Sequence, residues 1–365
     1  MALVLTEDET MLADAARGLL DRLAPVTAFR TLRDSTDTLR YDPALLNSLA
    51  ENGLVAPNIP EENGGVGMGV AAAGVIIEMA AHNLTAAPLV SAAMAAELIA
   101  RLGTDDQRDK LLPALISGEL VVACAFEEAS RHDPSLLDTT ARNDTLSGDK
   151  TAVIDGIGAS HMLVSAKDGD ATRLFLVDTS VEGCHVEPIQ TIDGRNFASV
   201  VLKGARGEPV GQGDVSEAIS MALDIGRALL AAELLGISDQ AFTMTVSYLK
   251  ERKQFDRVIG TYQALQHRTA RLYARLDLAR GVVLKALRSI DSGSEDASQL
   301  ASLSKCVMTR LSRDVLAEAV QMHGGIGVTD EFDLGLYFKR ARVAGSLLGD
   351  DRFHAERLAQ LRWQL

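Results

Sequence analysis

Apolar residues recur with a helical period over roughly the first third of the chain. Thr6 precedes three acidic residues and an apolar stripe that runs to Leu20, which predicts an N-capped amphipathic helix. Further helices are predicted at residues 42–52, 69–81, 87–102 and 105–116. The segment PEENGGVGMG (60–69) interrupts this series, because glycine permits the positive φ angles of a turn. We expect an N-terminal helical domain at residues 1–118.

Between residues 119 and 211 the pattern changes to short β-type runs. Segments such as VVACAFEE, HMLVSAKDG and TRLFLVDTS are separated by glycine and aspartate turns. The sequence Leu-Ser-Gly-Asp at residues 146–149 predicts a hairpin turn. We expect a middle β-barrel-like domain over residues 119–211.

Long helical patterns return after residue 212. Helices are predicted from about residue 216 to 250, over 263–292 and 294–323, and from about residue 351 onward. No proline follows Pro209, which suits an uninterrupted bundle. We expect a C-terminal four-helix bundle over residues 212–365, and an α+β fold with a β-domain between two helical domains.

The composition is typical of a folded soluble protein. The 365 residues are 47% hydrophobic and 24% charged. A net charge of −14 argues against nucleic acid as the main partner, although a local arginine cluster can still bind an anionic ligand. The three cysteines show neither zinc nor redox spacing, so we expect no metal site and a cytoplasmic location. Neither a signal peptide nor membrane insertion is expected, because the N-terminus lacks a basic segment and the apolar run 70–77 is too short.

Five segments together resemble the acyl-CoA dehydrogenase family across essentially the whole chain. They are LTEDETML, IPEENGGVGMG, LGTDDQRDKLLPALISGE, ERKQFDRVIGTYQALQH and QMHGGIGVTDE. Each segment alone is a weak signal, whereas their order and spacing are specific. The resemblance implies an FAD-dependent oxidoreductase acting on CH–CH bonds: a carboxylate removes the α-proton of an acyl-CoA and the flavin accepts a hydride. It also implies an electron acceptor such as electron-transfer flavoprotein.

The resemblance further implies that each flavin is held by two chains. The middle domain of one chain seats it, and the C-terminal helices of a neighbour grip its pyrophosphate. The residues that fit the neighbour-gripping pattern are Arg252, Phe255, Gln263, Gln321, Gly324 and Gly325. A guanidinium can pair with a diphosphate, and adjacent glycines let backbone N–H groups approach phosphate oxygens. The plainer alternative is a solvated arginine and a helix that ends at glycine.

The chain's own flavin-seating residues depart from the family pattern. The family's Thr-Glu-Pro-Gly-Ala-Gly-Ser-Asp-like loop corresponds here to FEEASRHDP (126–134), which keeps Glu127 and Asp133 but not the glycines or the serine. The family's Trp-Ile-Thr or Trp-Ile-Ser falls on residues 152–154, which are Ala, Val and Ile. An alanine and an isoleucine offer neither an aromatic wall nor a hydroxyl, so we expect this chain's own flavin site to be degraded.

No carboxylate stands at either position that the family uses for its base. The usual glutamate position falls on Leu348, and the alternative position on an earlier helix falls on Gly226. Asp350 is the best candidate for a relocated base, although it lies about 6 to 7 Å further along an extended chain. Asp224 and Arg227 keep a family spacing found near the CoA or acyl group, and an i,i+3 ion pair explains them equally well.

Three hypotheses follow. In the first, the chain is the non-base, β-type subunit of an α2β2 acyl-CoA dehydrogenase that oxidises a fatty or steroid-derived acyl-CoA. It would then complete the flavin site of a homologous subunit that carries the glutamate. In the second, it is a self-sufficient homotetrameric enzyme that uses Asp350. In the third, it is a non-catalytic scaffold or acyl-CoA-binding protein. The sequence favours the first, because a scaffold has no reason to keep a pyrophosphate grip and a complete enzyme has none to lose its ring-binding loop.

Overall fold

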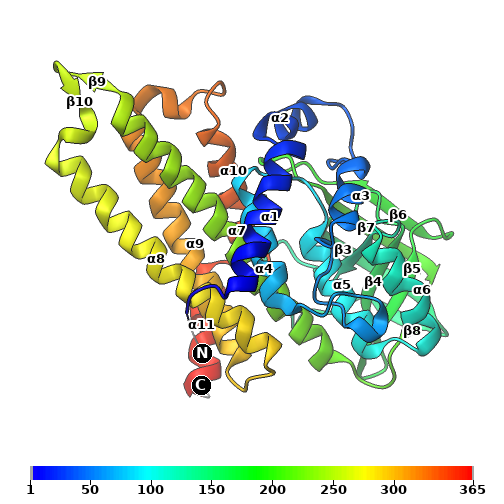
Figure 1. Ribbon diagram of the computed structural model, residues 1–365. Helices are drawn as coiled ribbons and strands as arrows, with labels where there is room; N and C mark the ends of the chain where they lie inside the picture. The colour runs from blue at the N-terminus through cyan, green and yellow to red at the C-terminus, as the bar shows by residue number, and fades with distance from the viewer. Residues whose placement is uncertain (1–2, 364–365) are drawn as a thin grey trace. The chain divides into compact units, whose positions relative to one another are not determined.

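The structure is a computed structural model that describes residues 3–363 (Figure 1). The helices and 3-10 turns are α1 (Glu7–Leu23), α2 (Val26–Asp34), α3 (Pro43–Glu51), η1 (Glu61–Asn63), α4 (Gly69–His82), α5 (Leu89–Leu102), α6 (Asp105–Ile116), α7 (Ser216–Glu251), η2 (Ile259–Thr261), α8 (Gln263–Asp291), α9 (Ala297–His323), η3 (Gly324–Val328), α10 (Leu334–Ser346) and α11 (Asp351–Trp363). The strands are β1 (Val122–Ala125), β2 (Thr140–Arg142), β3 (Thr145–Ile154), β4 (His161–Asp168), β5 (Ala171–Asp178), β6 (Cys184–Pro188), β7 (Phe197–Arg206), β8 (Glu208–Val210), β9 (Lys253–Gln254) and β10 (Arg257–Val258).

The predicted order of helical, β and helical segments is confirmed, and most long helices begin and end within a few residues of their predicted limits. The sequence analysis missed α2, α10 and the short strands β2, β8, β9 and β10. In space the described chain forms two compact units. The helical unit contains the residues up to Val26, Gly74–Thr85 and the residues from Arg227 onward; the sheet unit contains Thr27–Ala73 and Ala86–Gly226. The division into domains 1–118, 119–211 and 212–365 stays a prediction.

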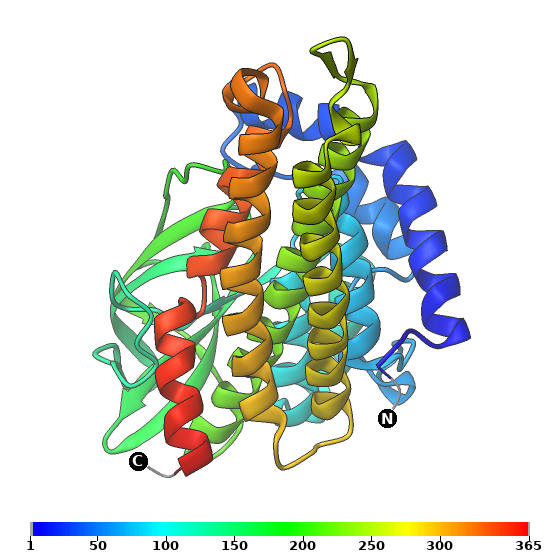
Figure 2. The ribbon, with the colours of Figure 1, turned by 90° about the vertical axis from the view of Figure 1, so that its left-hand side faces the viewer.

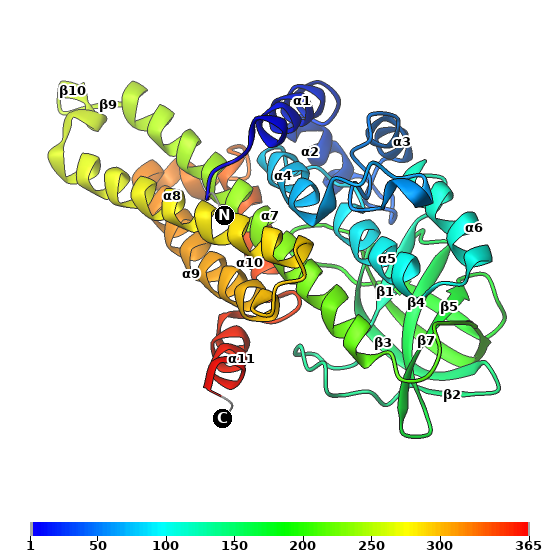
Figure 3. The ribbon, with the colours of Figure 1, turned by 60° about the horizontal axis from the view of Figure 1, so that its bottom comes forward.

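The sheet unit is built on one mixed sheet of eight strands with the order β6-β7-β3-β2-β4-β5-β8, to which β1 adds by pairing with β4. Both β1 and β2 run parallel to β4, whereas the other neighbours are antiparallel. Helix α5 packs against β1 and α6 (Figure 3). The sheet therefore has a helical cover formed by the residues that precede it in sequence.

The hairpin turn predicted at residues 146–149 is wrong. The turn lies at Asn143 and Asp144, whose φ angles of 51° and 60° give a two-residue connection between β2 and β3. Gly148 instead lies within β3, where a Cβ would come 2.5 Å from the Thr139 Oγ1. Glycine is therefore needed at this position, because the neighbouring chain segment lies too close for a side chain to fit.

The helical unit is organised around α9, which packs against α8, α10 and α11 (Figure 2). A capping box starts α1, where the Thr6 hydroxyl accepts from the Glu9 N–H and the Glu9 carboxylate accepts from the Thr6 N–H. Glu9 also pairs with Arg288 of α8, so the first helix is fastened to the bundle. None of the helices within residues 3–363 is both long and apolar enough to cross a membrane.

Helices α4 and α7 approach closely at Gly236. A Cβ there would lie 2.9 Å from the Ala81 Cβ and closer still to the Glu78 carbonyl oxygen. Gly335 in α10 is a matched contrast, because a Cβ there would meet nothing within 4 Å. One helix glycine therefore has a packing reason and the other has none.

We predict that Gly236→Ala lowers the free energy of unfolding by about 1–3 kcal/mol, because the two helices must separate. Gly335→Ala should leave it unchanged or raise it by up to about 1 kcal/mol, since alanine is the better helix former. Urea unfolding of the purified variants measures both values. Equal effects at the two positions would contradict the close helix crossing.

Candidate functional site

The six predicted cofactor residues lie at one end of the helical unit. Arg252 follows α7, Phe255 is at the tip of the β9–β10 hairpin, and Gln263 begins α8. Gln321 lies in the last turn of α9, and the two glycines begin η3. The rings of Tyr248 and His323 stack 4.6 Å apart, which joins the ends of α7 and α9. Figure 2 shows the hairpin and the end of α9 at the same end of the bundle, and we call residues 252–263 and 321–328 the hairpin end.

The hairpin end exposes a cation and an aromatic ring. Arg252 is exposed, and its guanidinium has no hydrogen bond or ion pair with any residue in the described range. Phe255 is 85% exposed, and it and Asp256 have φ angles of 54° and 60°, which a phenylalanine rarely adopts. On the other strand, the Arg257 guanidinium lies 3.8 Å from the centroid of the Tyr262 ring. The hairpin therefore holds Phe255 in a strained conformation with its ring exposed. No contact within the described residues compensates for this strain.

The glycine pair has two different roles. Gly324 adopts φ 66° and ψ −140°, a conformation open only to glycine. At Gly325 the backbone has no such requirement, and an added Cβ would meet nothing within 4 Å. No packing within residues 3–363 explains the second glycine, which suits close approach by a group from outside the chain.

His323, which directly precedes the two glycines, is a structural residue of the bundle. It is 3% exposed, its Nδ1 lies 2.8 Å from the Ala319 carbonyl oxygen, and its ring lies between those of Tyr248 and Phe332. Burial lowers the pKa of His323, so the neutral form is favoured.

Two ion pairs hold the loop 126–134, which the resemblance matches to a flavin-seating loop. Glu127 pairs with His132 at 2.5 Å. Glu128 pairs with the buried Lys150 at 2.5 Å and also accepts from the Thr139 N–H. The Thr151 N–H donates to the Glu127 carbonyl, so the backbone of Glu127 and the carboxylates of Glu127 and Glu128 are all engaged by groups of the chain itself.

The same ion pair perturbs both of its members. Burial alone would raise the pKa of Glu128, but the hydrogen bond and the charge of Lys150 outweigh burial and lower it. Burial lowers the pKa of Lys150, against the attraction of Glu128. Beyond Lys150, strand β3 bulges, and Ala152 adopts a φ of 48° where the family has its aromatic residue.

Leu348 occupies the expected base position with a buried, apolar side chain. It is 7% exposed and has a φ of 51°. Arg227, which is 1% exposed, donates from Nε to the Leu348 carbonyl oxygen at 3.3 Å, and its guanidinium lies 5.7 Å from the Phe353 ring centroid. Asp224 is 3% exposed on the same helix. The Arg227 side chain thus contacts the segment at which the base is expected.

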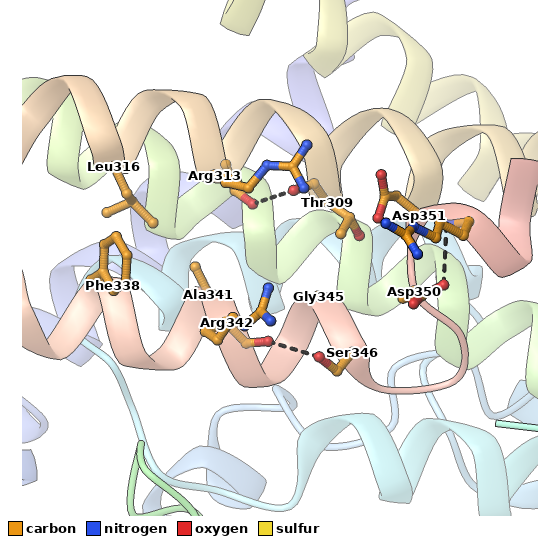
Figure 4. Close-up of a pocket in the computed structure, with 12 residues that line it drawn as sticks. Thr309, Arg313, Leu316, Phe338, Ala341, Arg342, Gly345, Ser346, Asp350 and Asp351 are labelled. Carbon is orange, nitrogen blue, oxygen red and sulfur yellow. Dashed lines mark hydrogen bonds between the residues drawn. The ribbon is translucent and has the colours of Figure 1, made fainter. Parts of the chain in front are cut away.

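A pocket of about 420 Å³ opens between α9, α10 and the start of α11 (Figure 4). Its polar lining includes Thr309, Ser312, Arg313, Arg342, Ser346, Asp350, Asp351 and Arg352. Asp350, the candidate for a relocated base, caps α11 by accepting from the N–H groups of Arg352 and Phe353 at 3.1 and 2.9 Å. Asp351 pairs with Arg310 at 2.9 Å. Both carboxylates are therefore engaged by neighbouring groups.

The pocket's cations are not engaged in the same way. Within the described residues, the side chains of Arg313, Arg342 and Arg352 make no hydrogen bond or ion pair. The Thr309 Oγ1 is buried without a hydrogen-bond partner. Three guanidiniums and a free hydroxyl around one pocket suit an anionic group, such as a phosphate. The sequence analysis missed these residues, because only folding brings residues 309–316 and 338–352 together.

Sequence comparison identifies the chain. Residues 6–119 match the acyl-CoA dehydrogenase N-terminal domain, and residues 216–361 match the acyl-CoA dehydrogenase C-terminal domain. The acyl-CoA dehydrogenase IpdE2 of Mycolicibacterium smegmatis is 31% identical over 358 residues, which cover 97% of this chain and 98% of that protein. The chain belongs to the acyl-CoA dehydrogenase family. It is thus a member of a family of flavoprotein oxidoreductases that act on acyl-CoA.

Solved structures agree with this identification. A variant of the Tcur3481-Tcur3483 steroid acyl-CoA dehydrogenase superposes with a TM-score of 0.90 and 32% identity over 98% of both chains. The ChsE4-ChsE5 complex from Mycobacterium tuberculosis superposes with a TM-score of 0.91 over 100% of both chains, and at 23% identity it supports the fold alone. The predicted acyl-CoA dehydrogenase fold and the resemblance to a subunit of a two-component member are confirmed.

We predict that Lys150→Met lowers the free energy of unfolding by about 3–5 kcal/mol, because it leaves the Glu128 carboxylate buried without its counterion. The double variant Lys150→Met/Glu128→Gln should recover part of this loss, since the charge is removed with its partner. Lys110→Met, at an exposed lysine of the sheet unit, is the control and should change stability by less than about 0.5 kcal/mol. If Lys150→Met lowered the free energy of unfolding no more than Lys110→Met does, the ion pair would not stabilise the loop.

Proposed function

We propose that this chain is the β-type subunit of a hetero-oligomeric, FAD-dependent acyl-CoA dehydrogenase. It completes the flavin site of a homologous subunit that carries the catalytic glutamate. The observation that carries the proposal is a contrast between two parts of the chain. The hairpin end offers an unpaired arginine and an uncovered glycine, whereas the ring-seating loop is closed on itself and position 348 is a leucine.

The residues of the hairpin end fit the diphosphate part of a partner-bound flavin. Arg252 can donate two parallel hydrogen bonds to diphosphate oxygens. The backbone N–H groups at Gly324 and Gly325 can approach the same oxygens without a Cβ in the way. Gln263 and Gln321 are exposed amides at the same end and can add hydrogen bonds. When bound, FAD supplies hydride acceptance, while this chain's groups orient it.

We assign the substrate to the class of acyl-CoA thioesters, with fatty or steroid-derived acyl groups as candidates. The two-component relative at 32% identity is a steroid acyl-CoA dehydrogenase, which supports a bulky acyl group. An electron-transfer flavoprotein is the proposed electron acceptor. The three free cysteines are consistent with work in the reducing cytoplasm.

We predict that the chain purified alone carries no flavin, and that co-expression with its homologous partner gives a yellow complex that oxidises acyl-CoA. In that complex, Arg252→Gln should weaken flavin binding roughly 10- to 100-fold, because a charge-assisted hydrogen bond contributes about 1.5–3 kcal/mol. Flavin absorbance after gel filtration and a flavin titration measure the loss.

The matched control is Arg206→Gln, at an exposed arginine of β7 whose side chain makes no hydrogen bond or ion pair with the described residues. It should leave flavin content unchanged. Unchanged flavin content in the Arg252→Gln complex would instead support a scaffold role for this chain. Stoichiometric flavin and turnover in the lone chain would support a self-sufficient enzyme.

The pocket between α9, α10 and α11, which we call the arginine pocket after Arg313, Arg342 and Arg352, favours that second candidate, a self-sufficient enzyme. It places three unpaired guanidiniums beside Asp350, the proposed relocated base, within one chain. A flavin whose phosphates lay in this pocket would depend on the chain's own α9 and α10. Asp350 would then have to leave its capping role at α11 to act as a base.

The two candidates differ in which arginines retain the flavin. If the hairpin end holds the flavin of a partner, the Arg313→Gln/Arg342→Gln variant should keep its flavin and Arg252→Gln should lose it. If the chain binds its own flavin in the pocket, the Arg313→Gln/Arg342→Gln variant should lose flavin even as a homo-oligomer. Flavin-to-protein ratios of the purified assemblies decide between them, and we expect the first outcome.

A further inference from the structure

Lys305 is a buried lysine at a place where the helix pattern calls for an apolar residue. It lies on α9 between Ala301 and Met308, which are buried on the same face, and it is itself 0% exposed. Lysine is almost never fully buried unless its ammonium has partners, because removal of a charge from water is costly. The Lys305 side chain must therefore have hydrogen-bond acceptors in this part of the fold.

Those acceptors are backbone carbonyls at the end of α10 and in the connection between α10 and α11. The Lys305 Nζ donates to the Gly345 carbonyl oxygen at 3.0 Å and to the Gly349 carbonyl oxygen at 3.2 Å. Arg227 donates to the Leu348 carbonyl oxygen between them. Two buried basic side chains, from α9 and α7, thus bond three carbonyls within residues 345–349. We call this segment, the end of α10 and the connection that follows it, the α10–α11 loop.

The α10–α11 loop requires such support, because its backbone is strained. Leu348 has a φ of 51°, which costs a branched residue roughly 1–2 kcal/mol. Gly349 has a φ of 107° and lies so close to the Phe353 and His354 rings that a Cβ would not fit. Without the cationic donors, the carbonyls would be buried and unsatisfied, and the loop would relax to hydrate them.

We propose that Lys305 is a positioning residue that fixes the conformation of the α10–α11 loop. Through this loop it sets the places of position 348, Asp350 and Arg352, the last two of which line the arginine pocket. Lys305 does not act on a ligand itself, because it is fully buried and its ammonium is bonded to the loop. The proposal does not depend on where the flavin binds, so its test can fail independently of the proposed function.

The charge of Lys305 gives a signature that a purely packing role would not have. Burial lowers the pKa of Lys305 to about 7, against the attraction of Glu233. The other charged groups that face it are Arg227 on α7 and Asp350 and Asp351 beside α11, while Arg340 of α10 lies 3.6 Å from Glu233. Because the folded pKa lies below the unfolded value of 10.5, the folded state loses this proton first as pH rises. The contribution of this group to stability therefore increases between pH 7 and 10.5.

The experiment measures amide hydrogen exchange in the unmutated protein and in Lys305→Met, purified in the same assembly. In the unmutated protein, peptides covering residues 345–354 should be protected like the adjoining helices. In Lys305→Met these peptides should exchange at least ten times faster, with no change in peptides from α8. Lys339→Met, at an exposed lysine of α10, is the matched control and should leave the loop protected.

Two results would overturn the proposal. One is a folded Lys305→Met protein whose loop peptides keep their protection. The other needs no variant: loop peptides in the unmutated protein that exchange as fast as a free chain would show that the loop is not held. The pH dependence of stability gives a third test. The free energy of unfolding should rise from pH 7 to 10 more steeply in the unmutated protein than in Lys305→Met.

Discussion

The buried ion pair between Glu128 and Lys150 constrains what the sheet unit of this chain can do. It joins the loop after β1 to strand β3, and the Glu127–His132 pair closes the same loop a few residues away. A flavin ring needs hydrogen-bond donors and a flat apolar wall that face outward, and here the side chains of Glu127, Glu128 and His132 are bonded to other groups of the chain. Because breaking a buried ion pair leaves an uncompensated charge, this loop cannot open at low cost to receive a ring. These ion pairs support the proposal that this chain does not seat a flavin ring of its own.

The hairpin end has the opposite character. Arg252 is exposed and unpaired within the described chain, Phe255 is held outward in a strained turn, and Gly325 has open space where a side chain would fit. Natural chains seldom retain strain and uncovered glycine without a function, since each lowers stability and is easily replaced. Under the proposed function, both features have one explanation: the hairpin end would bind a flavin that belongs to a different chain. This explanation gives the arginine pocket no part in flavin binding, whereas a self-sufficient enzyme would use it. The pocket therefore distinguishes the two candidate enzymes.

Much of the fold follows from the sequence, because long amphipathic helices and alternating strands leave clear periodic patterns. Helix α10 was missed because Gly335 and Gly345 weaken its pattern, and the β2–β3 turn was misplaced because Gly148 is a stronger turn signal than Asn143–Asp144. The hairpin-end residues could be predicted as cofactor residues because they lie in short contiguous segments, and this assignment stays a prediction. The arginine pocket was not predicted, because it exists only where α9, α10 and α11 meet. Lys305 did leave a signal, a lysine on the apolar face of a predicted helix, but its carbonyl acceptors lie 40 residues and more away in sequence.

Lys305 also shows why a protein retains a costly buried charge. Replacement of a buried charge by a well-packed apolar residue is often neutral or stabilising, so global stability gives little reason to keep this lysine. What an apolar residue cannot do is donate to two backbone carbonyls at once and so select one conformation of a strained loop. That loop sets the position of Leu348 and the rim of the arginine pocket. The lysine is therefore better understood as a determinant of conformation than of stability, and the local protection of residues 345–354 is the quantity that separates the two roles.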